Sequence, residues 1–234
     1  MSHALPCWPR RFLAAAILLA LLGVTGCGEH GSVTAPRPNP RGGAPAPNSP
    51  ENAIRLFEWG WDHRDTLAVA EVLAGDFRFF FALGDSAGNV FRGDPVDRET
   101  MLRMDYHLFI GGGNAAPAKS IALQFDPKLI PQDDGRPGKD PRWHKEILTG
   151  VNLSIRTDDN SWNVQGNARF FVVRGDSALI PQDLVAKGLG PDSTRWYIDR
   201  WDDETLSGPG ARVVPAQPLP TRVVTWGDIL ALYR

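Results

Sequence analysis

Cysteine is nearly absent from this chain of 234 residues, which has only Cys7 and Cys27. Both lie in the first 27 residues, so the remaining sequence cannot form a disulfide and has to be stabilised by packing. An excess of positive charge is also lacking, because 25 Lys and Arg residues stand against 27 Asp and Glu, for a net charge of -2. This balance predicts no nucleic-acid partner.

Recognisable motifs for metals and cofactors are missing as well. No cluster of His and Cys has the spacing of zinc ligands, and no acidic loop has the spacing of a calcium site. The only glycine run, Gly111 to Gly113, does not match a phosphate-binding loop, and we expect it to end a helix. We therefore predict no metal, no cofactor and no assignable catalytic residue.

The one long hydrophobic run lies near the start, from Phe12 to Val24. Its length of about 13 residues fits the apolar region of an export signal and falls short of the roughly 20 residues that span a bilayer. Arg10 and Arg11 precede the run, and small residues and Cys27 follow it. A short buried helix is the alternative interpretation of this segment.

Val24-Thr25-Gly26-Cys27 resembles the lipobox of bacterial lipoproteins. The resemblance implies that residues 1–26 are a signal peptide, that Cys27 is lipidated, and that the protein is anchored through this lipid to a membrane of the cell envelope. Gly28 stands where an aspartate would indicate inner-membrane retention, which favours the outer membrane. Residues 27–49, rich in Pro and Gly, are expected to form a tether.

Helix-start signals open the region that follows the tether. Ser49, Pro50 and Glu51 predict an N-cap and a first turn, and Ile54, Phe57 and Trp61 fall on one face of the predicted helix. Two further helices are expected. Asp65 is predicted to cap the second, with Leu67, Ala70 and Leu73 inward and an end at Gly75, and Asp97 to cap the third, which runs to about Phe109 with Met101 and Leu108 inward.

Alternating apolar residues predict strands over most of the remaining chain. Expected strands lie at 77–81, 90–92, 121–125, 143–156, 162–172 and 195–201, the fourth and fifth forming a long hairpin. Residues 205–234 are expected to be a Pro-rich tail that ends in a short helix, introduced by a capping-box pattern from Thr225 to Asp228. The pentapeptide Leu-Ile-Pro-Gln-Asp occurs at 129–133 and at 179–183, which predicts either two similar loops at one rim of the sheet or a coincidence.

The order of these elements resembles the nuclear transport factor 2-like superfamily, which includes SnoaL-like proteins. The residues that carry the resemblance are Pro50 to Trp59, Asp62 to Asp65, Phe77 to Phe81 and Arg195 to Trp201, within residues 50–204. It implies an α+β cone, with N-terminal helices packed on a curved antiparallel sheet and a pocket between them. Members of this fold include enzymes, binding modules and assembly domains, so the resemblance does not define an activity.

Four residues are candidates for ligand binding. Tyr106 and His107 lie near the end of the third predicted helix, which forms a pocket wall in this fold; the alternative is an exposed pair at a helix end. Trp59 and Trp61 cannot share one inner face, so Trp59 is a candidate pocket lip. Arg200 shares strand parity with Trp196 and Ile198, which are expected to face inward, and would there hold a carboxylate or an acidic ligand; the alternative is an ion pair with Asp202 or Glu58.

Tyr197 and Trp201 have the opposite parity on the last strand. They would either present aromatic rings to a partner or be covered by the tail and the helix that contains Trp226.

The sequence therefore predicts a lipid-anchored, non-enzymatic envelope protein that binds a small apolar ligand in the cone or docks an envelope partner. One alternative is an isomerase, dehydratase or cyclase that uses His107 or an unassigned Asp as base. Another is a domain that assembles into a homodimer. An enzyme requires a buried titratable group within hydrogen-bond reach of a second polar group, whereas a binding protein requires only an apolar cavity.

Overall fold

The computed structural model describes residues 42–85, 94–205 and 221–234. The chain divides into two units, Met1–Pro38 and Asn39–Arg234, and all described residues belong to the second. The predicted signal peptide, Cys27, the strand predicted at 90–92 and parts of the predicted tether and tail lie outside the described residues. Among the described residues, no helix has both the length and the apolar character needed to cross a membrane.

The three N-terminal helices begin where the sequence predicts. They are α1 (Pro50–Asp62), α2 (Thr66–Val72) and α3 (Arg98–Phe109). The side chains that cap them, each accepting a backbone N–H from the first turn, belong to Ser49, Asp65 and Asp97. These caps confirm the predicted helix starts.

The prediction for α2 is wrong in two details. Leu67, expected inward, is 55% exposed. The helix ends at Val72, because the chain continues from Leu73 directly into a strand that contains Gly75. Gly75 pairs there with the backbone oxygen of Leu179 at 2.7 Å, so the glycine belongs to a close approach of two segments and not to a helix end.

In residues 42–85, 94–205 and 221–234, eight strands form one sheet with the order β2-β1-β7-β6-β5-β3, while β4 pairs with β5 and β8 with β6. Their bounds are β1 (Leu73–Phe80), β2 (Val96–Asp97), β3 (Ser120–Phe125), β4 (Gln132–Asp133), β5 (His144–Arg156), β6 (Ser161–Arg174), β7 (Trp196–Asp203) and β8 (Thr221–Val223). Most pairs are antiparallel, including the predicted hairpin of β5 and β6, whereas β1–β7 and β6–β8 are parallel.

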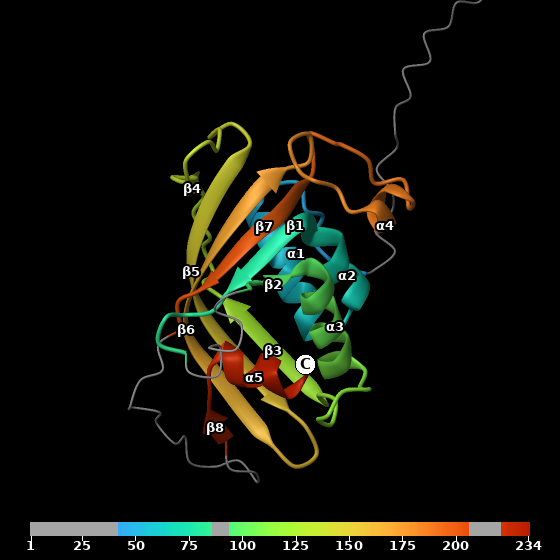
Figure 1. Ribbon diagram of the computed structural model, residues 1–234, viewed down its shortest axis with the longest axis vertical. Coiled ribbons are helices and arrows are strands. Elements are labelled where there is room, and N and C mark those ends of the chain that lie inside the picture. Colours follow the sequence, from blue (N-terminus) through green and yellow to red (C-terminus); the bar gives the residue numbers. More distant parts are fainter. Residues whose placement is uncertain (1–41, 86–93, 206–220) are drawn as a thin grey trace, which may run out of the picture. The chain divides into compact units, whose positions relative to one another are not determined.

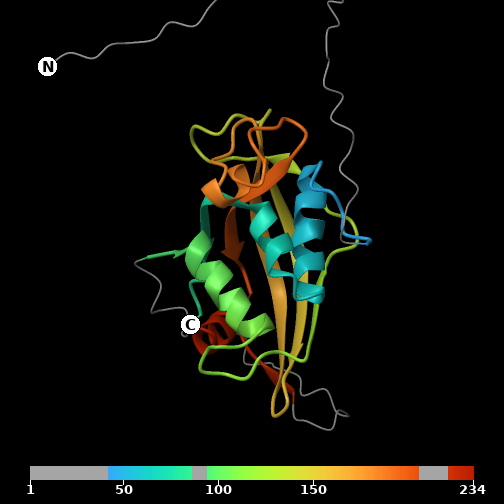
Figure 2. The same cartoon turned by 90° about the vertical axis from the view of Figure 1, so that its right-hand side faces the viewer.

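Helices α1, α2 and α3 lie side by side over one face of the curved sheet (Figures 1 and 2). The main core fills the space between these two layers and contains the inner residues of β3, β5, β6 and β7. The α+β class with N-terminal helices on a curved sheet is therefore confirmed. Helix α5 (Trp226–Leu232) belongs to the same core, since Trp226, Ile229 and Leu230 are buried in it.

A bulge in β7 changes which of its side chains face the core. Ile198 pairs with Val172 and Arg200 with Phe171, so Asp199 is the extra residue between them. Ile198 and Trp201 consequently both face the core, and Arg200 faces away from it. The sequence-based expectation that Arg200 shares the face of Ile198 is wrong, because strict alternation fails at the bulge.

The two copies of Leu-Ile-Pro-Gln-Asp adopt different structures. The first ends in β4, which pairs with the start of β5, and the second leads into the short helix α4 (Gln182–Val185). Both lie at the same end of the sheet (Figure 1). Their local structures show that the shared sequence does not encode a shared loop.

Candidate functional site

The interior between the helices and the sheet is lined by aromatic rings. Trp61 of α1, Trp201 of β7 and Trp226 of α5 are all fully buried. The Trp226 ring meets the ring of Trp61 edge to face at a centroid distance of 5.1 Å, and that of Trp201 at 4.6 Å. Phe57 of α1 also contacts Trp201, at 5.4 Å. Three elements that are distant in sequence thus build one aromatic cluster.

The polar atoms of this cluster have no partners. The indole Nε1 atoms of Trp61, Trp201 and Trp226 are buried and make no hydrogen bond within the described part of the chain. Buried indole N–H groups usually find an acceptor, because an unmade hydrogen bond costs on the order of 1 to 3 kcal/mol. The interior therefore contains three donors that an acceptor oxygen could satisfy.

Asp105 adds a carboxyl group to the same core. It lies on α3, is fully buried, and neither of its carboxyl oxygens makes a hydrogen bond to any residue that the structure describes. One turn further along α3, the ring of Phe109 meets that of Trp61 at 5.4 Å. Asp105 and Phe109 share a helix face, which places the carboxyl in the layer that borders the aromatic cluster.

Burial raises the pKa of Asp105 well above its ordinary range, and desolvation is the cause. The carboxyl is thereby driven toward its neutral form, in which it can both donate and accept a hydrogen bond.

Asp105 is not among the candidate residues predicted from the sequence, although the sequence contains a signal for it. Met101, Asp105 and Leu108 are spaced four and three residues apart, so Asp105 falls on the apolar stripe of α3. A carboxylate on such a stripe is costly unless it is paired or functional.

Tyr106 and His107 follow Asp105 on α3 but are placed differently. Tyr106 is 50% exposed, which matches the alternative of an exposed residue at a helix end. His107 is half-buried, and its Nδ1 lies 2.9 Å from the backbone oxygen of Tyr233, to which it can donate. His107 therefore holds the end of α5 against α3, and neither side chain lines the aromatic cluster described above.

Trp59 and Arg200 lie elsewhere again. Trp59 packs against the margin of the core and stacks on His63 with ring centroids 4.0 Å apart. Arg200 makes two hydrogen bonds to Asp202, at 2.6 and 2.9 Å, and its guanidinium lies 4.0 Å from the centre of the Phe80 ring. The ion pair with Asp202 is the alternative that the sequence left open. Among the four predicted candidates, only Tyr106 and His107 are brought together, and these as neighbours in sequence.

Tyr197 and Trp201, the two aromatic residues considered for docking a partner, are both fully buried. Trp226 covers Trp201, which confirms that alternative for Trp201. The alternative is wrong for Tyr197, because Trp226 belongs to the main core and Tyr197 does not. Tyr197 belongs to a second, smaller core with Ala74, Val173 and residues of the 178–189 segment, including Leu184 of α4. These core residues of the strands alternate with those of the main core and so lie on the opposite face of the sheet.

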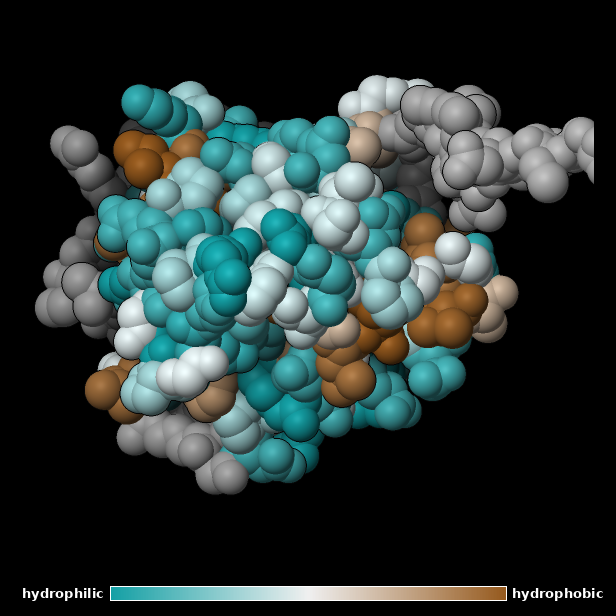
Figure 3. All heavy atoms as spheres, turned by 90° about the horizontal axis from the view of Figure 1, so that it is seen from above, coloured by the Kyte–Doolittle hydropathy of each residue, from teal (hydrophilic) through white to brown (hydrophobic). Residues whose placement is uncertain are grey.

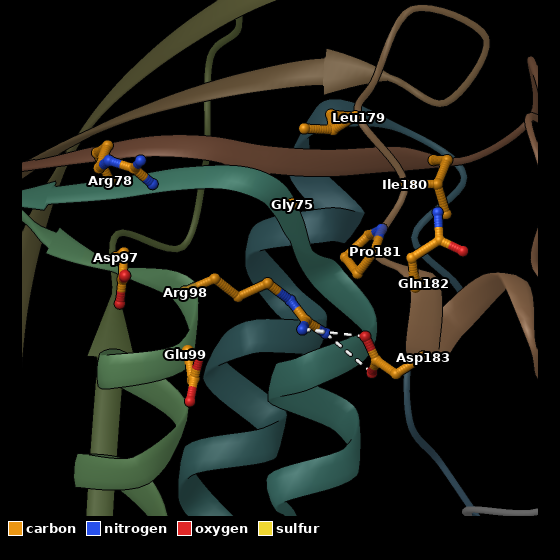
Figure 4. A pocket seen from close by; sticks show the side chains of 10 residues that line it. All are labelled: Gly75, Arg78, Asp97, Arg98, Glu99, Leu179, Ile180, Pro181, Gln182 and Asp183. Atoms are coloured by element: carbon orange, nitrogen blue, oxygen red, sulfur yellow. Dashed lines mark hydrogen bonds and ion pairs between the residues drawn. The ribbon is translucent and has the colours of Figure 1, made fainter.

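An open groove of about 440 Å³ lies beside the start of α3 (Figure 4). Its lining includes Arg78, Asp97, Arg98, Glu99 and Asp183. Arg98 is already engaged, because it donates to the backbone oxygens of Ala70 and Leu73 and pairs with Asp183 at 3.1 Å. The groove thus carries charges of both signs. Its most buried cation, Arg98, satisfies backbone carbonyl groups at the C-terminal end of α2.

The end of the domain that carries α4 and β4 is mainly hydrophilic, with separate hydrophobic patches (Figure 3). Exposed apolar side chains in the segments of this end include Ile130, Leu179 and Val185. Among the described residues, no group of three or more His, Cys, Asp or Glu side chains is arranged to hold a metal ion.

Comparison with known proteins gives structural neighbours only. No family model matches the chain, and no curated protein matches it. Solved structures that resemble it are of the nuclear transport factor 2-like kind. One is a nuclear transport factor 2-like superfamily protein from Salmonella enterica, with 11% identity and a TM-score of 0.42, covering 68% of this chain and 90% of that chain.

Two further neighbours have the names of enzymes. A protein provisionally assigned as a scytalone dehydratase from Novosphingobium aromaticivorans is 11% identical, with a TM-score of 0.46, and covers 72% of this chain and 89% of that chain. The hexachlorocyclohexane dehydrochlorinase LinA-type3 from Novosphingobium barchaimii is 9% identical, with a TM-score of 0.40, and covers 71% and 92%. Likeness at this level does not define a reaction or a ligand, so functional inference rests on the residues of this chain.

Proposed function

We propose that this protein is a lipid-anchored protein of the bacterial cell envelope that holds a small, mainly apolar molecule between the helices and the sheet. Asp105 contacts the polar group of that molecule. The lipid on Cys27 keeps the domain at the membrane, and the first part of the segment that follows Cys27 serves as the tether. The predicted tether boundary at residue 49 is too late, because Ala44 is buried in the main core and the Pro47 carbonyl accepts a hydrogen bond from the backbone N–H of Trp196.

The observation that carries the proposal is the fully buried, unbonded carboxyl of Asp105. Burying a polar group without a hydrogen bond destabilises a fold by on the order of 1 to 3 kcal/mol. An apolar side chain at this position would avoid that penalty. Polar groups that lower stability in this way are characteristic of binding and catalytic sites.

The surroundings of Asp105 favour binding over catalysis. A general base is normally held in place by a hydrogen bond to a second polar group. Neither oxygen of Asp105 has such a partner among the described residues. Tyr106 and His107, the neighbouring candidates from the sequence, do not supply this partner. The Tyr106 side chain is half exposed to solvent, and His107 hydrogen-bonds to the backbone oxygen of Tyr233.

Native mass spectrometry of the protein purified from its own host tests the proposed binding. We expect a retained small molecule on the wild-type protein and its loss from Asp105→Leu. Tyr106→Phe serves as the matched control, because it changes the neighbouring exposed residue and leaves the interior intact. A wild-type protein that carries no ligand and binds none from an apolar extract would contradict the proposal, and the same spectra report the subunit count.

Metabolic labelling tests the anchor. Radioactive palmitate should be incorporated into the wild-type chain and not into Cys27→Ser, with Cys7→Ser as the control. The labelled chain should have lost the mass of residues 1–26. A full-length, unlabelled product would show that the N-terminal segment is not a lipoprotein signal.

A second function, an enzyme with Asp105 as general acid or base, is favoured by one observation. Desolvation raises the pKa of this carboxyl, which brings its titration closer to the working pH of an acid–base catalyst. If a retained ligand is converted on incubation and the rate disappears in Asp105→Asn, the enzyme proposal is preferred over simple binding.

A further inference from the structure

Two loops meet at one end of the domain, the end that contains α4 and β4 (Figure 1). One loop joins β3 to β5 and contains β4, and the other joins β6 to β7 and contains α4. The opposite end contains β8, where Val223 pairs with Asn163 of β6. From Asn163 to its last residue, Arg174, β6 extends about 35 Å, which separates the two ends.

Both loops expose apolar side chains at the α4/β4 end. In the first copy of Leu-Ile-Pro-Gln-Asp, Leu129 is 8% exposed and Ile130 is 54% exposed. In the second copy, Ile180 is 8% exposed and Leu179 is 60% exposed. Val185 of α4 is a further exposed residue, at 43%. Each copy therefore buries one apolar side chain, which anchors the loop, and turns the other toward solvent.

The loop that contains α4 is fixed to the rest of the domain. The backbone N–H of Gly75 donates to the backbone oxygen of Leu179 at 2.7 Å, and Arg98 pairs with Asp183 at 3.1 Å. The fold therefore holds Leu179 and Val185 in positions that face solvent, where contact with an apolar phase would be favourable.

The N-terminal segment enters the domain near the same end. The Pro47 carbonyl accepts a hydrogen bond from the backbone N–H of Trp196, the first residue of β7. Residue 42 is five positions before Pro47 and so lies within about 17 Å of it. Cys27 is 15 positions before residue 42, a chain length that spans at most about 50 Å. Turning the β8 end toward a membrane at Cys27 would use most of this length, at a cost in chain entropy, whereas the α4/β4 end needs little of it.

We propose that the α4/β4 end faces the lipid bilayer that holds the anchor, and that Leu179 and Val185 enter its headgroup region. The inference rests on the proposed lipidation of Cys27 and deepens it, because it names the surface of the domain that contacts the membrane. Lys187 is exposed two residues after Val185, so its ammonium group can contact lipid phosphate there.

A small apolar surface is sufficient for this contact because the anchor makes the contact intramolecular. Two inserted side chains would bind a vesicle only weakly by themselves. A lipid on Cys27 keeps the bilayer at a high effective concentration, so a weak contact is occupied much of the time. We therefore expect an oriented domain in the lipidated protein and little vesicle binding by the unlipidated Cys27→Ser chain.

Fluorescence quenching on the full lipidated protein tests the orientation. Under the proposed processing the mature chain has no free thiol, because Cys7 is removed and Cys27 carries the lipid. Leu179→Cys and Val185→Cys are labelled with a nitrobenzoxadiazole dye and reconstituted into vesicles of phosphatidylethanolamine and phosphatidylglycerol that contain nitroxide-labelled lipid. Val223→Cys, which replaces an apolar residue of 40% exposure at the opposite end, is the matched control.

We expect the nitroxide lipid to quench labels at 179 and 185 at least about fivefold more than a label at 223, because an interfacial contact lies within about 10 Å of the headgroup boundary. Equal quenching at the three positions, its absence from all of them, or stronger quenching at 223 would overturn the inference. A label at 179 that responds to protein density and not to nitroxide lipid would assign this end to contact between copies, which also overturns it.

Amide hydrogen exchange tests the contact without a label. The backbone N–H groups of Ala186 and Gly188 are hydrogen-bonded within the loop that contains α4. Their exchange in the vesicle-anchored wild type should be about threefold slower than in unlipidated Cys27→Ser, because the bilayer restricts opening of this segment.

The double variant Leu179→Glu with Val185→Glu should lose this slowing, and Val223→Glu should keep it. All three positions are exposed, so the thermal unfolding midpoint should stay close to that of the wild type and shows that each variant is folded. Slowing that persists in the double variant would contradict the inference.

The outcomes separate this inference from the proposed function. If palmitate labels the chain but quenching is equal at 179 and 223, the anchor stands and the orientation fails. If palmitate is not incorporated and thiol reagents react with Cys27, the anchor fails and the orientation fails with it. Neither outcome changes the test of ligand binding at Asp105.

Discussion

The backbone N–H of Gly227 donates a hydrogen bond to the carboxylate of Asp85, and this bond joins the first turn of α5 to the turn that follows β1. Asp203, at the end of β7, lies close enough for the charge of Asp85 to act on it. Burial is the main reason that the pKa of Asp203 is raised to about 6, and the charge of Asp85 adds to the effect. The attachment of α5 is therefore next to a titrating group.

The free energy of unfolding should rise as the pH falls from 7.5 to 4.5. Asp203 binds a proton more tightly in the folded protein than in the unfolded chain, so its stabilising contribution is fully present at low pH and is lost as the pH rises through about 6. A shift of this size corresponds to about 2 to 3 kcal/mol. Urea unfolding at several pH values measures it.

Asp203→Asn should remove the part of that pH dependence that Asp203 contributes and leave the part that comes from Asp105. Asparagine keeps an oxygen that can accept from the N–H and hydroxyl of Thr205, as Asp203 does, but cannot ionise. Asp105 contributes the same pH dependence to the wild type and to Asp203→Asn. The difference between their free energies of unfolding at each pH therefore isolates the contribution of Asp203. A variant whose stability varies with pH as steeply as that of the wild type would assign the effect to another group.

Asp105→Leu should stabilise the domain while it weakens ligand binding. The change removes an unbonded carboxyl from an apolar core, which we expect to raise the free energy of unfolding by about 1 to 3 kcal/mol. Thermal and urea unfolding measure the gain. A loss of stability would mean that the carboxyl contributes a favourable interaction in the fold, and the case for a ligand-facing role would then fall.

Trp201→Ala should destabilise the domain strongly, by about 3 to 5 kcal/mol. Its ring contacts Phe57, Phe79, Phe170 and Trp226, so truncation opens a cavity at the centre of the core. Trp59→Ala is the matched control, and removal of this partly buried ring should cost about 1 kcal/mol. Similar losses for the two variants would contradict the inward orientation of Trp201 that the bulge at Asp199 produces.

Arg136→Ala should destabilise the outer face of the sheet by about 2 kcal/mol or more. Arg136 pairs with the buried carboxylates of Asp134 and Asp199, at 2.7 and 3.0 Å, and its guanidinium lies 4.0 Å from the centre of the Phe171 ring. Removing the guanidinium leaves the buried carboxylate of Asp134 without its ion-pair partner, although the backbone N–H of residue 136 still donates to it. Arg142→Ala, which breaks an exposed pair with Asp140, should leave the urea midpoint unchanged.

Local signals in the sequence were sufficient for most of the secondary structure. The caps at Ser49, Asp65 and Asp97 depend on a side chain and the next three residues, so short-range chemistry defines them. The buried residues of β5 follow strict alternation, and the capping box of α5 is again local. These elements could be predicted because no distant residue changes their pattern.

The features that were missed depend on tertiary packing. Arg200 was assigned to the wrong face because the bulge at Asp199 arises from the register of β7 against β6 and β1. Asp105 stood on a recognisable apolar stripe, but its isolation is visible only once the surrounding side chains are placed. Trp226 was expected to cover Trp201, whereas its contact with Trp61 required three elements to be brought together.

The parallel pairing of β1 with β7 has a consequence for how the chain reaches its native state. Leu73 pairs with Ile198, so β1 can complete its pairing only with a strand that is distant in sequence. By contrast, β5 and β6 are adjacent in sequence and can pair locally as a hairpin. Non-local pairings of this kind slow folding. A fragment that stops before β7 would leave β1 and β6 with open edges, and we expect such a fragment to aggregate.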